Sequence, residues 1–455
     1  MIMDRLFKLK EHNTTIRTEI AGGVTTFMTM AYILAVNPKI LGDAGMDPHA
    51  VLIATCLASA IGCFSMGLMA NLPFALSAGM GLNAFLAYTV VHGMGIPWQV
   101  ALLAVFIEGL LFILMSLTNV REAIFNAIPL TLKMGVSVGI GLYIAFIGLQ
   151  NAGLSVDAST LVTIVDFREN FATQGICAVL AATGLFLTAV LYIKKVRGAI
   201  LFGILITWLL GMICQIAGLY VPDPAGGFNS LFPAKIISLD LSSLGDTFGE
   251  CFHTDFHEVG IFNFIMVMFS FLFVDMFDTI GTLIGVSAKA GMLDENGRLP
   301  AIRPALLSDA IATTCGAILG TSTTSTYVES SAGIAIGGRT GLTAVTTGCL
   351  FLLSCMFSPL FTVIPTFATA PALIMIGFLM FEGVKGLSFH ADTMTETIPA
   401  YLCIIAMPLF YSISEGISLG IISYVIINLI CGKRGSITPL MYVLAVLFLA
   451  NYIFL

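Results

Sequence analysis

The sequence predicts an all-α polytopic membrane protein, and three observations support this: its composition, its long apolar segments and the charge of its loops. Hydrophobic residues make up 58% of the 455 residues and charged residues only 10%, whereas a soluble domain carries about 25% charged residues. A soluble globule this apolar could not cover its own surface, so a soluble enzyme is excluded. The formal net charge of −7 leaves no basic domain for binding nucleic acid.

The apolar segments have the length that a membrane requires, about 20 residues for each spanning helix. About 14 candidate spans follow one another, at residues 20–38, 50–70, 74–92, 97–117, 134–151, 174–193, 199–220, 262–287, 305–320, 322–338, 341–358, 366–383, 398–412 and 415–431. A further apolar stretch at 437–455 is either an interfacial helix or a final crossing. The ten cysteines include no CxxC pair and mostly sit singly in apolar runs, so they are interpreted as small membrane-helix residues.

Lysine and arginine in short loops set the orientation of a multi-span protein. They precede the first candidate span, separate the sixth from the seventh, follow the eighth and recur near the end of the chain. The alternate loops are poor in positive charge, and the stretch 221–258 carries six acids against one cation, Lys235. The first 19 residues are polar and lack the apolar region of a signal peptide. We therefore expect a multi-pass protein of the cytoplasmic (inner) membrane with a cytoplasmic N-terminus.

Two of the candidate spans are poor continuous helices. Residues 71–85 contain a proline and two glycines, and residues 320–338 carry eight Ser/Thr residues before their glycines. Non-helical backbone at membrane depth survives only where protein or a polar cavity satisfies it. Interrupted segments at corresponding places in two halves of a chain indicate the binding site of a transporter. The sequence thus predicts non-helical backbone beside a binding site in these two segments.

Acidic residues inside the candidate spans are the strongest indication of function, because an ionisable group there costs several kcal/mol. Five such residues occur: Asp275, Asp278, Asp309, Glu329 and Glu108. Asp275 and Asp278 stand at i and i+3, on one helix face, and two carboxylates so close cannot both ionise cheaply. Binding and release of a proton near neutral pH is then possible. The alternative, an acid that only caps a broken helix or bonds to a neighbouring span, is favoured for Glu108 and balanced for Asp309.

The candidate spans contain no lysine or arginine that could pair with these acids. A neutral ligand with N–H donors would suit them, because heterocyclic N–H groups form charge-assisted hydrogen bonds to carboxylates and a pair of such bonds fixes a planar ring. Asn83 adds one acceptor and two donors. Phe27, Phe74 and Phe85 could stack on such a ring, although lipid or core packing is favoured for each of them.

Five residues of types that can bind a metal ion lie close together at the end of the long outer loop. Cys251, His253, Asp255, His257 and Glu258 crowd together there. Two histidines four residues apart can bind zinc on a helix. Because the loop is not clearly helical and no further ligands stand at metal spacing, a solvated loop is favoured. No metal or other cofactor is expected.

Four motifs carry a resemblance to a known family: AGGVTTFMTMAYILAVNP (21–38), AGMGLNAF (78–85), FVDMFDTIGTLIGV (273–286) and GTSTTSTYVESSAGIAIGGRTGLTA (320–344). The sequence closely resembles the azaguanine-type purine permeases of the wider xanthine/uracil permease superfamily. The match runs through nearly the whole chain, and the last two motifs are specific.

The resemblance implies a fold of 14 spans in two inverted seven-span repeats, each giving four spans to a core domain and three to a gate domain. The third and tenth spans then hold short extended segments, at 71–79 and 320–328, that face each other at mid-membrane and are each followed by a half-helix. The implied division is a cytoplasmic segment at 1–19, core at 20–117 and 259–358, gate at 118–220 and 359–455, and an outer loop at 221–258. A homodimer is a possible assembly.

The resemblance also implies uptake of a purine base together with protons. Residue by residue, it assigns the eighth-span acids to Asp275 and Asp278, the tenth-span acid to Glu329, and a third-span pair to Gly81 and Asn83. We expect Asp275, Glu329, Asn83 and Gly81 to form the base site. Asp275 and Glu329 should accept hydrogen bonds from the ring, and Asp278 should tune the proton on Asp275. The candidates for holding the transported proton are Asp275, Asp278, Asp309 and Glu329.

An aspartate at position 275 resembles the branch that carries hypoxanthine and guanine, whose ring N–H groups a carboxylate can accept, whereas N1 of adenine is an acceptor. An adenine, xanthine or uracil permease of the same fold is the alternative. A rival from another class is an intramembrane enzyme that holds Mg²⁺ and a prenyl diphosphate on its aspartates. It would require a second aspartate motif and nearby cations, and neither is apparent. A channel is also disfavoured.

Overall fold

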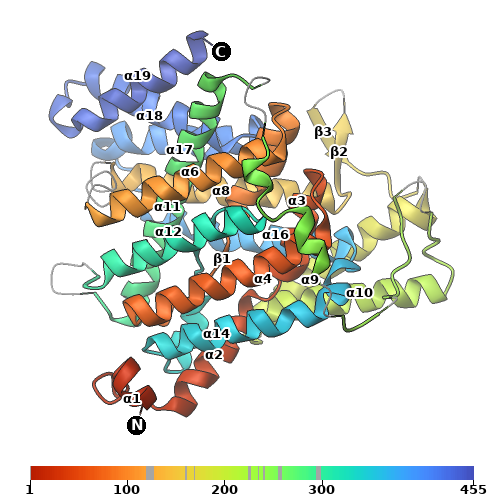
Figure 1. Cartoon of the computed structure of the whole chain (residues 1–455). Coiled ribbons are helices and arrows are strands. Elements are labelled where there is room, and N and C mark those ends of the chain that lie inside the picture. Colours follow the sequence, from red (N-terminus) through yellow and green to blue (C-terminus); the bar gives the residue numbers. More distant parts are fainter. Residues whose placement is uncertain are drawn as a thin grey trace.

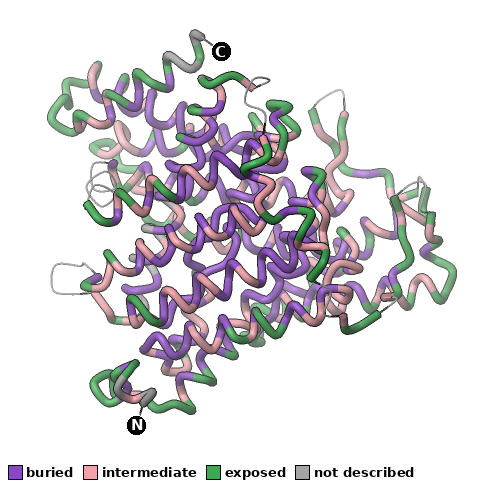
Figure 2. The backbone as a smooth tube through the Cα atoms, in the orientation of Figure 1, coloured by how far each residue is buried: buried purple, intermediate pink, exposed green. Residues whose placement is uncertain are grey.

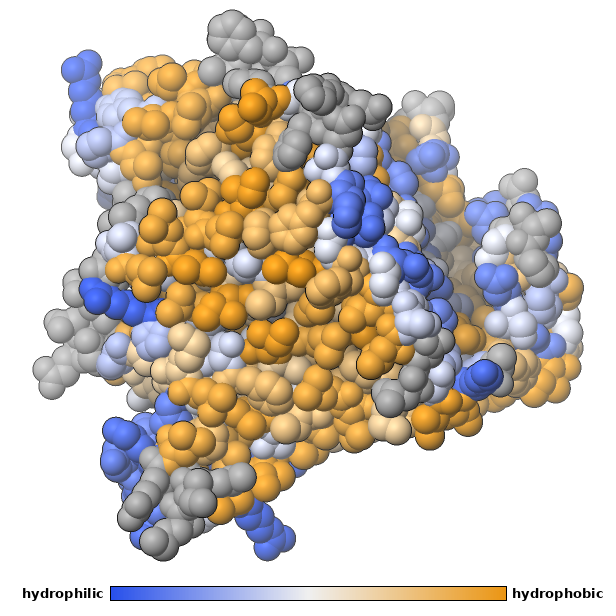
Figure 3. Space-filling model, in the orientation of Figure 1, coloured by the Kyte–Doolittle hydropathy of each residue, from blue (hydrophilic) through white to orange (hydrophobic). Residues whose placement is uncertain are grey.

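The computed structural model describes residues 2–118, 128–158, 161–168, 170–223, 227–233, 235–238, 241–254, 259–293 and 299–454. Most of the long helices lie side by side in Figure 1, with the N-terminus at the bottom of the view and the C-terminus at the top. Within the described residues, ten helices are long and apolar enough to cross a membrane. Figure 3 shows an apolar band across the middle of the molecule and hydrophilic residues towards the ends of the helices. The all-α, multi-span prediction is therefore confirmed.

The elements follow the predicted order along the chain. In the first half they are α1 Ile2–Phe7, α2 Ile16–Met30, α3 Ile33–Asp43, α4 Pro48–Ser65, β1 Leu76–Ala78, α5 Met80–Ala84, α6 Trp98–Leu117, α8 Leu130–Asn151, β2 Ser155–Ala158, β3 Leu161–Ile164, α9 Ile176–Ile193 and α10 Ala199–Ile216. In the second half they are α11 Ile261–Ala290, α12 Ile302–Leu319, β4 Thr324–Thr326, α13 Ser330–Ile336, α14 Gly341–Ser354, α15 Ser358–Thr362, α16 Thr366–Phe381, α17 Met394–Leu409, α18 Ile413–Ile430 and α19 Pro439–Phe454.

Short turns extend several helices: η1 Met66–Ala70 follows α4, η2 Phe85–Gly93 follows α5, η3 Phe171–Gly175 precedes α9, and η8 Glu382–Gly386 follows α16. The apolar stretch predicted at 437–455 forms α19, which packs on α18.

The two predicted helix breaks are the centre of the architecture. β1 and β4 form an antiparallel pair with Leu76 opposite Thr326 and Ala78 opposite Thr324, and α5 and α13 continue from them as short helices. The prediction of two facing extended segments is confirmed, although each strand is shorter than the predicted stretch. Gly320, with φ of +97°, ends α12 immediately before the second break, in a conformation that glycine adopts at little cost.

The helices pack in two groups. In the first group α4 contacts both α12 and α14, while α2 contacts α13 and α14 and α6 contacts α11 and α12. In the second group α8 contacts α16 and α17, α9 contacts α10 and α16, and α17 contacts α18. Close backbone approach needs glycine in the first group, since a Cβ on Gly341 would lie 2.0 Å from the carbonyl oxygen of Gly67. Figure 2 shows the buried residues concentrated in the middle of the molecule, where the strands lie.

Candidate functional site

The paired strands are tied together beyond their own ladder. The backbone N–H of Gly79 donates to the carbonyl of Thr323 at 2.8 Å, and that of Tyr327 donates to the carbonyl of Ala75 at 3.0 Å. The hydroxyl of Tyr327 donates to the carbonyl of Ala78 at 2.5 Å. Because all backbone groups near the break need partners at membrane depth, these bonds hold the two short arms in a fixed register beside α11.

Two acids beside β4 are partly exposed, and we call Asp278 and Glu329 the reachable pair. The hydroxyl of Ser325 on β4 donates to Oδ2 of Asp278 at 3.0 Å, and the hydroxyl of Tyr32 donates to Oε1 of Glu329 at 2.8 Å. The two carboxyls interact electrostatically with each other. Val328, next to Glu329, is 48% exposed although it lies among buried residues of the break. Of the five predicted acids, these two are the ones that are not fully buried.

Two other acids lie fully buried behind them, and we call Asp275 and Asp309 the buried pair. The hydroxyl oxygen of Thr279 lies 3.1 Å from Oδ1 of Asp275 and 3.1 Å from Oδ1 of Asp309. A hydroxyl carries one proton, so both contacts are full hydrogen bonds when one carboxyl is protonated and donates to the hydroxyl while the other accepts from it. With both carboxyls ionised, the two acceptors share the single hydroxyl proton.

Glu108 on α6 is the fifth predicted acid and is also fully buried. Its Oε2 lies 3.4 Å from the hydroxyl of Thr323, directly before β4. The contact joins α6 to the base of the strand, which agrees with the structural role that the sequence favoured for this residue.

Asn83 and Gly81 lie on α5 and face neighbouring helices. Asn83 is fully buried, and its amide nitrogen donates to Oδ1 of Asn37 on α3. Asn37 in turn donates to the hydroxyls of Thr55, at 2.8 Å, and Thr321, at 3.2 Å. A Cβ on Gly81 would lie 2.7 Å from Cγ2 of Ile140, so glycine allows α8 to approach α5. In this conformation Asn83 therefore fixes α5 against α3, and Gly81 allows α5 to pack closely against α8.

The three candidate stacking rings pack against protein. Phe74 and Phe85 are fully buried, and Phe85 meets Phe271 edge to face with ring centroids 5.0 Å apart. Phe27 meets Phe351 in the same way at 5.3 Å. Phe85 is the one that borders the site, because Phe271 lies one turn from Asp275 on α11.

Sequence reasoning missed the hydroxyl groups that hold the acids: Tyr32, Thr279, Ser325 and Thr323. Tyr32 lies at the break between α2 and α3, within one of the motifs that carry the family resemblance. A signal existed only for Tyr32, because a tyrosine at a helix break in an apolar span is uncommon, whereas Ser and Thr are too frequent in this chain to be informative.

The predicted cluster of metal-ligand types does not form a site within the described residues. Cys251 is buried and His253 lies 3.8 Å from Glu250, while Asp255, His257 and Glu258 lie outside the described residues. Across the part of the chain that the structure describes, no group of three metal-ligating side chains occurs. What the central arrangement can do is accept hydrogen bonds from a neutral ligand and hold a proton among its carboxyls.

Sequence comparisons with known proteins find membrane permeases, and a comparison of structures finds a transporter of the same fold. The model of the Permease family matches residues 17–419. The guanine/hypoxanthine permease PbuO of Bacillus subtilis is 44% identical over 97% of this chain and 98% of its own length. The adenine permease AdeP of Escherichia coli is 41% identical over 100% of this chain and 96% of its own. The transmembrane domain of the cyanobacterial bicarbonate transporter BicA shares the fold, with a TM-score of 0.61 at 15% identity, covering 89% of this chain and 97% of that chain.

Proposed function

This chain belongs to the Permease family, and we propose that it carries purine bases, with hypoxanthine and guanine preferred, into the cell together with protons by alternating access. The observation that carries the proposal is the reachable pair, two partly exposed acids beside β4 at a break in the helices. The family confirms the predicted resemblance to purine permeases and the prediction of a transporter rather than an enzyme.

The preference for oxopurines rests on hydrogen-bond polarity. Hypoxanthine and guanine present ring N–H donors that Asp278 and Glu329 could accept, while N1 of adenine would meet a carboxylate as a second acceptor. A site built to bond N–H groups strongly disfavours an analogue that lacks them. Relatives of both kinds resemble this chain, so an adenine, xanthine or uracil permease is the alternative. Competition among these bases separates the two.

We assign the base to the reachable pair and the transported proton to the buried pair. The support is the Thr279 hydroxyl, which forms a full hydrogen bond with each of Asp275 and Asp309 when that pair holds one proton. The sequence predicted instead that Asp275 touches the base and that Asp278 tunes its proton, with both among the candidates for proton coupling. Burial favours the new assignment, because Asp275 is fully buried while Asp278 is partly exposed.

We also propose the 14-span fold of two inverted repeats, with the predicted core and gate divisions. If α2 with α3 is the first span and α11 the eighth, spans seven apart make equivalent contacts. The contact of α6 with α12 corresponds to that of α14 with α4, and α6 with α11 corresponds to α14 with α2. In the second group α17 with α8 corresponds to α9 with α16, and α17 with α18 corresponds to α9 with α10. Under this scheme α19 lies outside the repeats.

Location and orientation follow the charge of the loops. We propose a cytoplasmic-membrane protein whose N-terminus is cytoplasmic, because lysine and arginine gather in the loops on that side. A homodimer stays a prediction.

Uptake of radiolabelled hypoxanthine tests the function. Cells that lack other purine carriers should accumulate hypoxanthine when they express the chain, guanine should compete strongly, and adenine, xanthine and uracil should compete weakly. Collapse of the proton gradient should abolish accumulation. Stronger competition by adenine than by guanine would favour the alternative, and absence of any nucleobase uptake from a correctly inserted protein would overturn the proposal.

A further inference from the structure

A second cavity lies away from the acids, at the end of the helices opposite the N-terminus. It measures about 440 Å³ and lies between α3 and α15 on one side and α8, α9, α16 and residues 227–231 on the other. Cavities of this size suit small-molecule ligands, whose pockets span roughly 300–1,000 Å³. No acid of the reachable or buried pair lines it. The cavity therefore separates elements of the two packing groups without being part of the central site.

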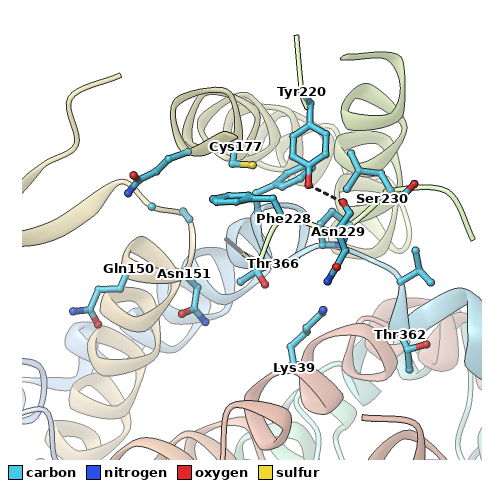
Figure 4. A pocket seen from close by; sticks show the side chains of 18 residues that line it. Lys39, Gln150, Asn151, Cys177, Tyr220, Phe228, Asn229, Ser230, Thr362 and Thr366 are labelled. Carbon is cyan, nitrogen blue, oxygen red and sulfur yellow. Dashed lines mark hydrogen bonds between the residues drawn. The ribbon is translucent and has the colours of Figure 1, made fainter. Parts of the chain in front are cut away.

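Its lining mixes apolar side chains with several polar ones, and among the described lining residues Lys39 is the one cation. Figure 4 shows Lys39 extending from α3 towards Asn229 and Thr366, with Asn151 of α8 nearby and the ring of Phe228 on the far wall. Gln150 adds a further amide to the lining. Amides offer both donors and acceptors, whereas an ammonium offers only donors.

Lys39 is half-buried, and within the described residues it donates no hydrogen bond and forms no ion pair. A cation withdrawn from water needs compensation. Asp43, one turn further along α3, attracts the Lys39 ammonium electrostatically. The carboxylate of Asp43 itself accepts a hydrogen bond from the hydroxyl of Tyr88 at 2.7 Å. The charges of Lys39 and Asp43 offset each other, so this cavity suits a neutral ligand that presents an acceptor to the Lys39 ammonium.

We propose that this cavity is an outer binding site at which an oxopurine base is captured before it reaches the reachable pair. The inference rests on the proposed function and adds a second site to it. Lys39 would donate to a ring carbonyl, the amides of Asn151 and Asn229 would pair with the remaining polar edge, and Phe228 would cover a ring face. Adenine has an amino group where hypoxanthine has the carbonyl, so this site favours oxopurines independently of the acids.

The test compares Lys39→Met with Lys235→Met in cells that take up hypoxanthine through this chain. Lys235 is an exposed lysine on the same side of the protein that does not line the cavity. Loss of one charge-assisted hydrogen bond should raise the KM for hypoxanthine about tenfold or more. The maximal rate at saturating hypoxanthine should stay within about twofold, because capture and not the central step is weakened. Lys235→Met should match the wild type in both values.

An unchanged KM in Lys39→Met would overturn the outer site while leaving the proposed function in place. Failure of the wild type to transport any purine would instead overturn the proposed function. If Lys39→Met does not reach the membrane, Asn229→Ala replaces it, since the contact of Asn229 with Tyr220 uses only its backbone oxygen. In that variant a raised KM supports the site, and an unchanged KM rejects it.

A binding measurement separates capture from transport. Purified Glu329→Ala protein should retain weak equilibrium binding of radiolabelled hypoxanthine, because the outer site remains. Addition of Lys39→Met to this variant should remove the remaining binding. Equal binding by the single and double variants would contradict the proposal.

Discussion

The reachable pair and the buried pair consist of the same kind of side chain, and each has one member on α11, yet the two pairs have different surroundings. Asp278 and Glu329 are partly exposed and each accepts from a separate hydroxyl, of Ser325 and of Tyr32. Asp275 and Asp309 are fully buried and share the hydroxyl of Thr279. We propose that this difference in burial, and not residue type, separates base binding at the reachable pair from proton binding at the buried pair.

The largest effect should come from Glu329→Ala, which removes an acid of the reachable pair. Each charge-assisted hydrogen bond contributes about 1.5–3 kcal/mol, and the change removes the acceptor on which the base depends, so hypoxanthine affinity should fall about 100-fold and uptake should vanish. Binding and uptake of radiolabelled hypoxanthine measure this. Glu11→Ala, at an exposed glutamate, is the control. Wild-type affinity in Glu329→Ala would remove that residue from the site.

Asp309→Asn should distinguish the roles of the two pairs, because it changes one member of the buried pair and leaves the reachable pair intact. The Thr279 hydroxyl would keep a partner on either side, so the fold should persist, but the pair could no longer exchange a proton. Accumulation driven by a proton gradient should fall about tenfold or more, while exchange of internal for external hypoxanthine continues. Counterflow assays with and without a gradient measure both, with the exposed Asp392→Asn as control. Unchanged gradient-driven accumulation would exclude Asp309 from proton coupling.

Tyr32→Phe should have a smaller effect, because it removes only the hydroxyl that orients Glu329. Loss of one hydrogen bond of about 1 kcal/mol should weaken hypoxanthine binding about fivefold, without change in the response to the proton gradient. Equilibrium binding to the purified protein checks this. Tyr192→Phe, at an exposed tyrosine, should bind as the wild type does. A changed response to the gradient would mean that the two pairs are not separate.

Asn83→Ala should change binding least, by less than about threefold, because its amide faces Asn37 and not open space. The stability should fall instead, by about 1–3 kcal/mol, since a buried polar partner of Asn37 is lost. Thermal unfolding of the purified protein alongside hypoxanthine binding distinguishes the two effects. A large loss of affinity with unchanged stability would restore the role in base binding that the sequence predicted.

The sequence predicted the helix breaks and the identity of the acids, because both depend on local rules. Pro73 and the nearby glycines weaken a continuous helix, and an acid in an apolar span is conspicuous wherever it lies. Burial could not be predicted in the same way. Asp275 and Asp278 differ by less than one turn of α11, and which of them is covered depends on Ser325 and Asp309, supplied by other elements.

The outer cavity was beyond sequence reasoning for a related reason. Lys39 marks the end of the first candidate span, and such a residue is usually only a boundary charge. Its neighbours Asn151, Asn229 and Thr366 come from distant parts of the chain. Only the packing of the two helix groups brings them together, and no local pattern records that packing.

The most direct test of the division between the pairs is the binding of hypoxanthine to Asp275→Asn and Asp278→Asn, together with proton release or uptake on binding. We expect Asp278→Asn to lose about tenfold or more in affinity and to keep proton exchange. We expect Asp275→Asn to bind hypoxanthine within about threefold of the wild type and to lose proton exchange. The reverse pattern, with affinity lost in Asp275→Asn and retained in Asp278→Asn, would contradict the division and place Asp275 against the base.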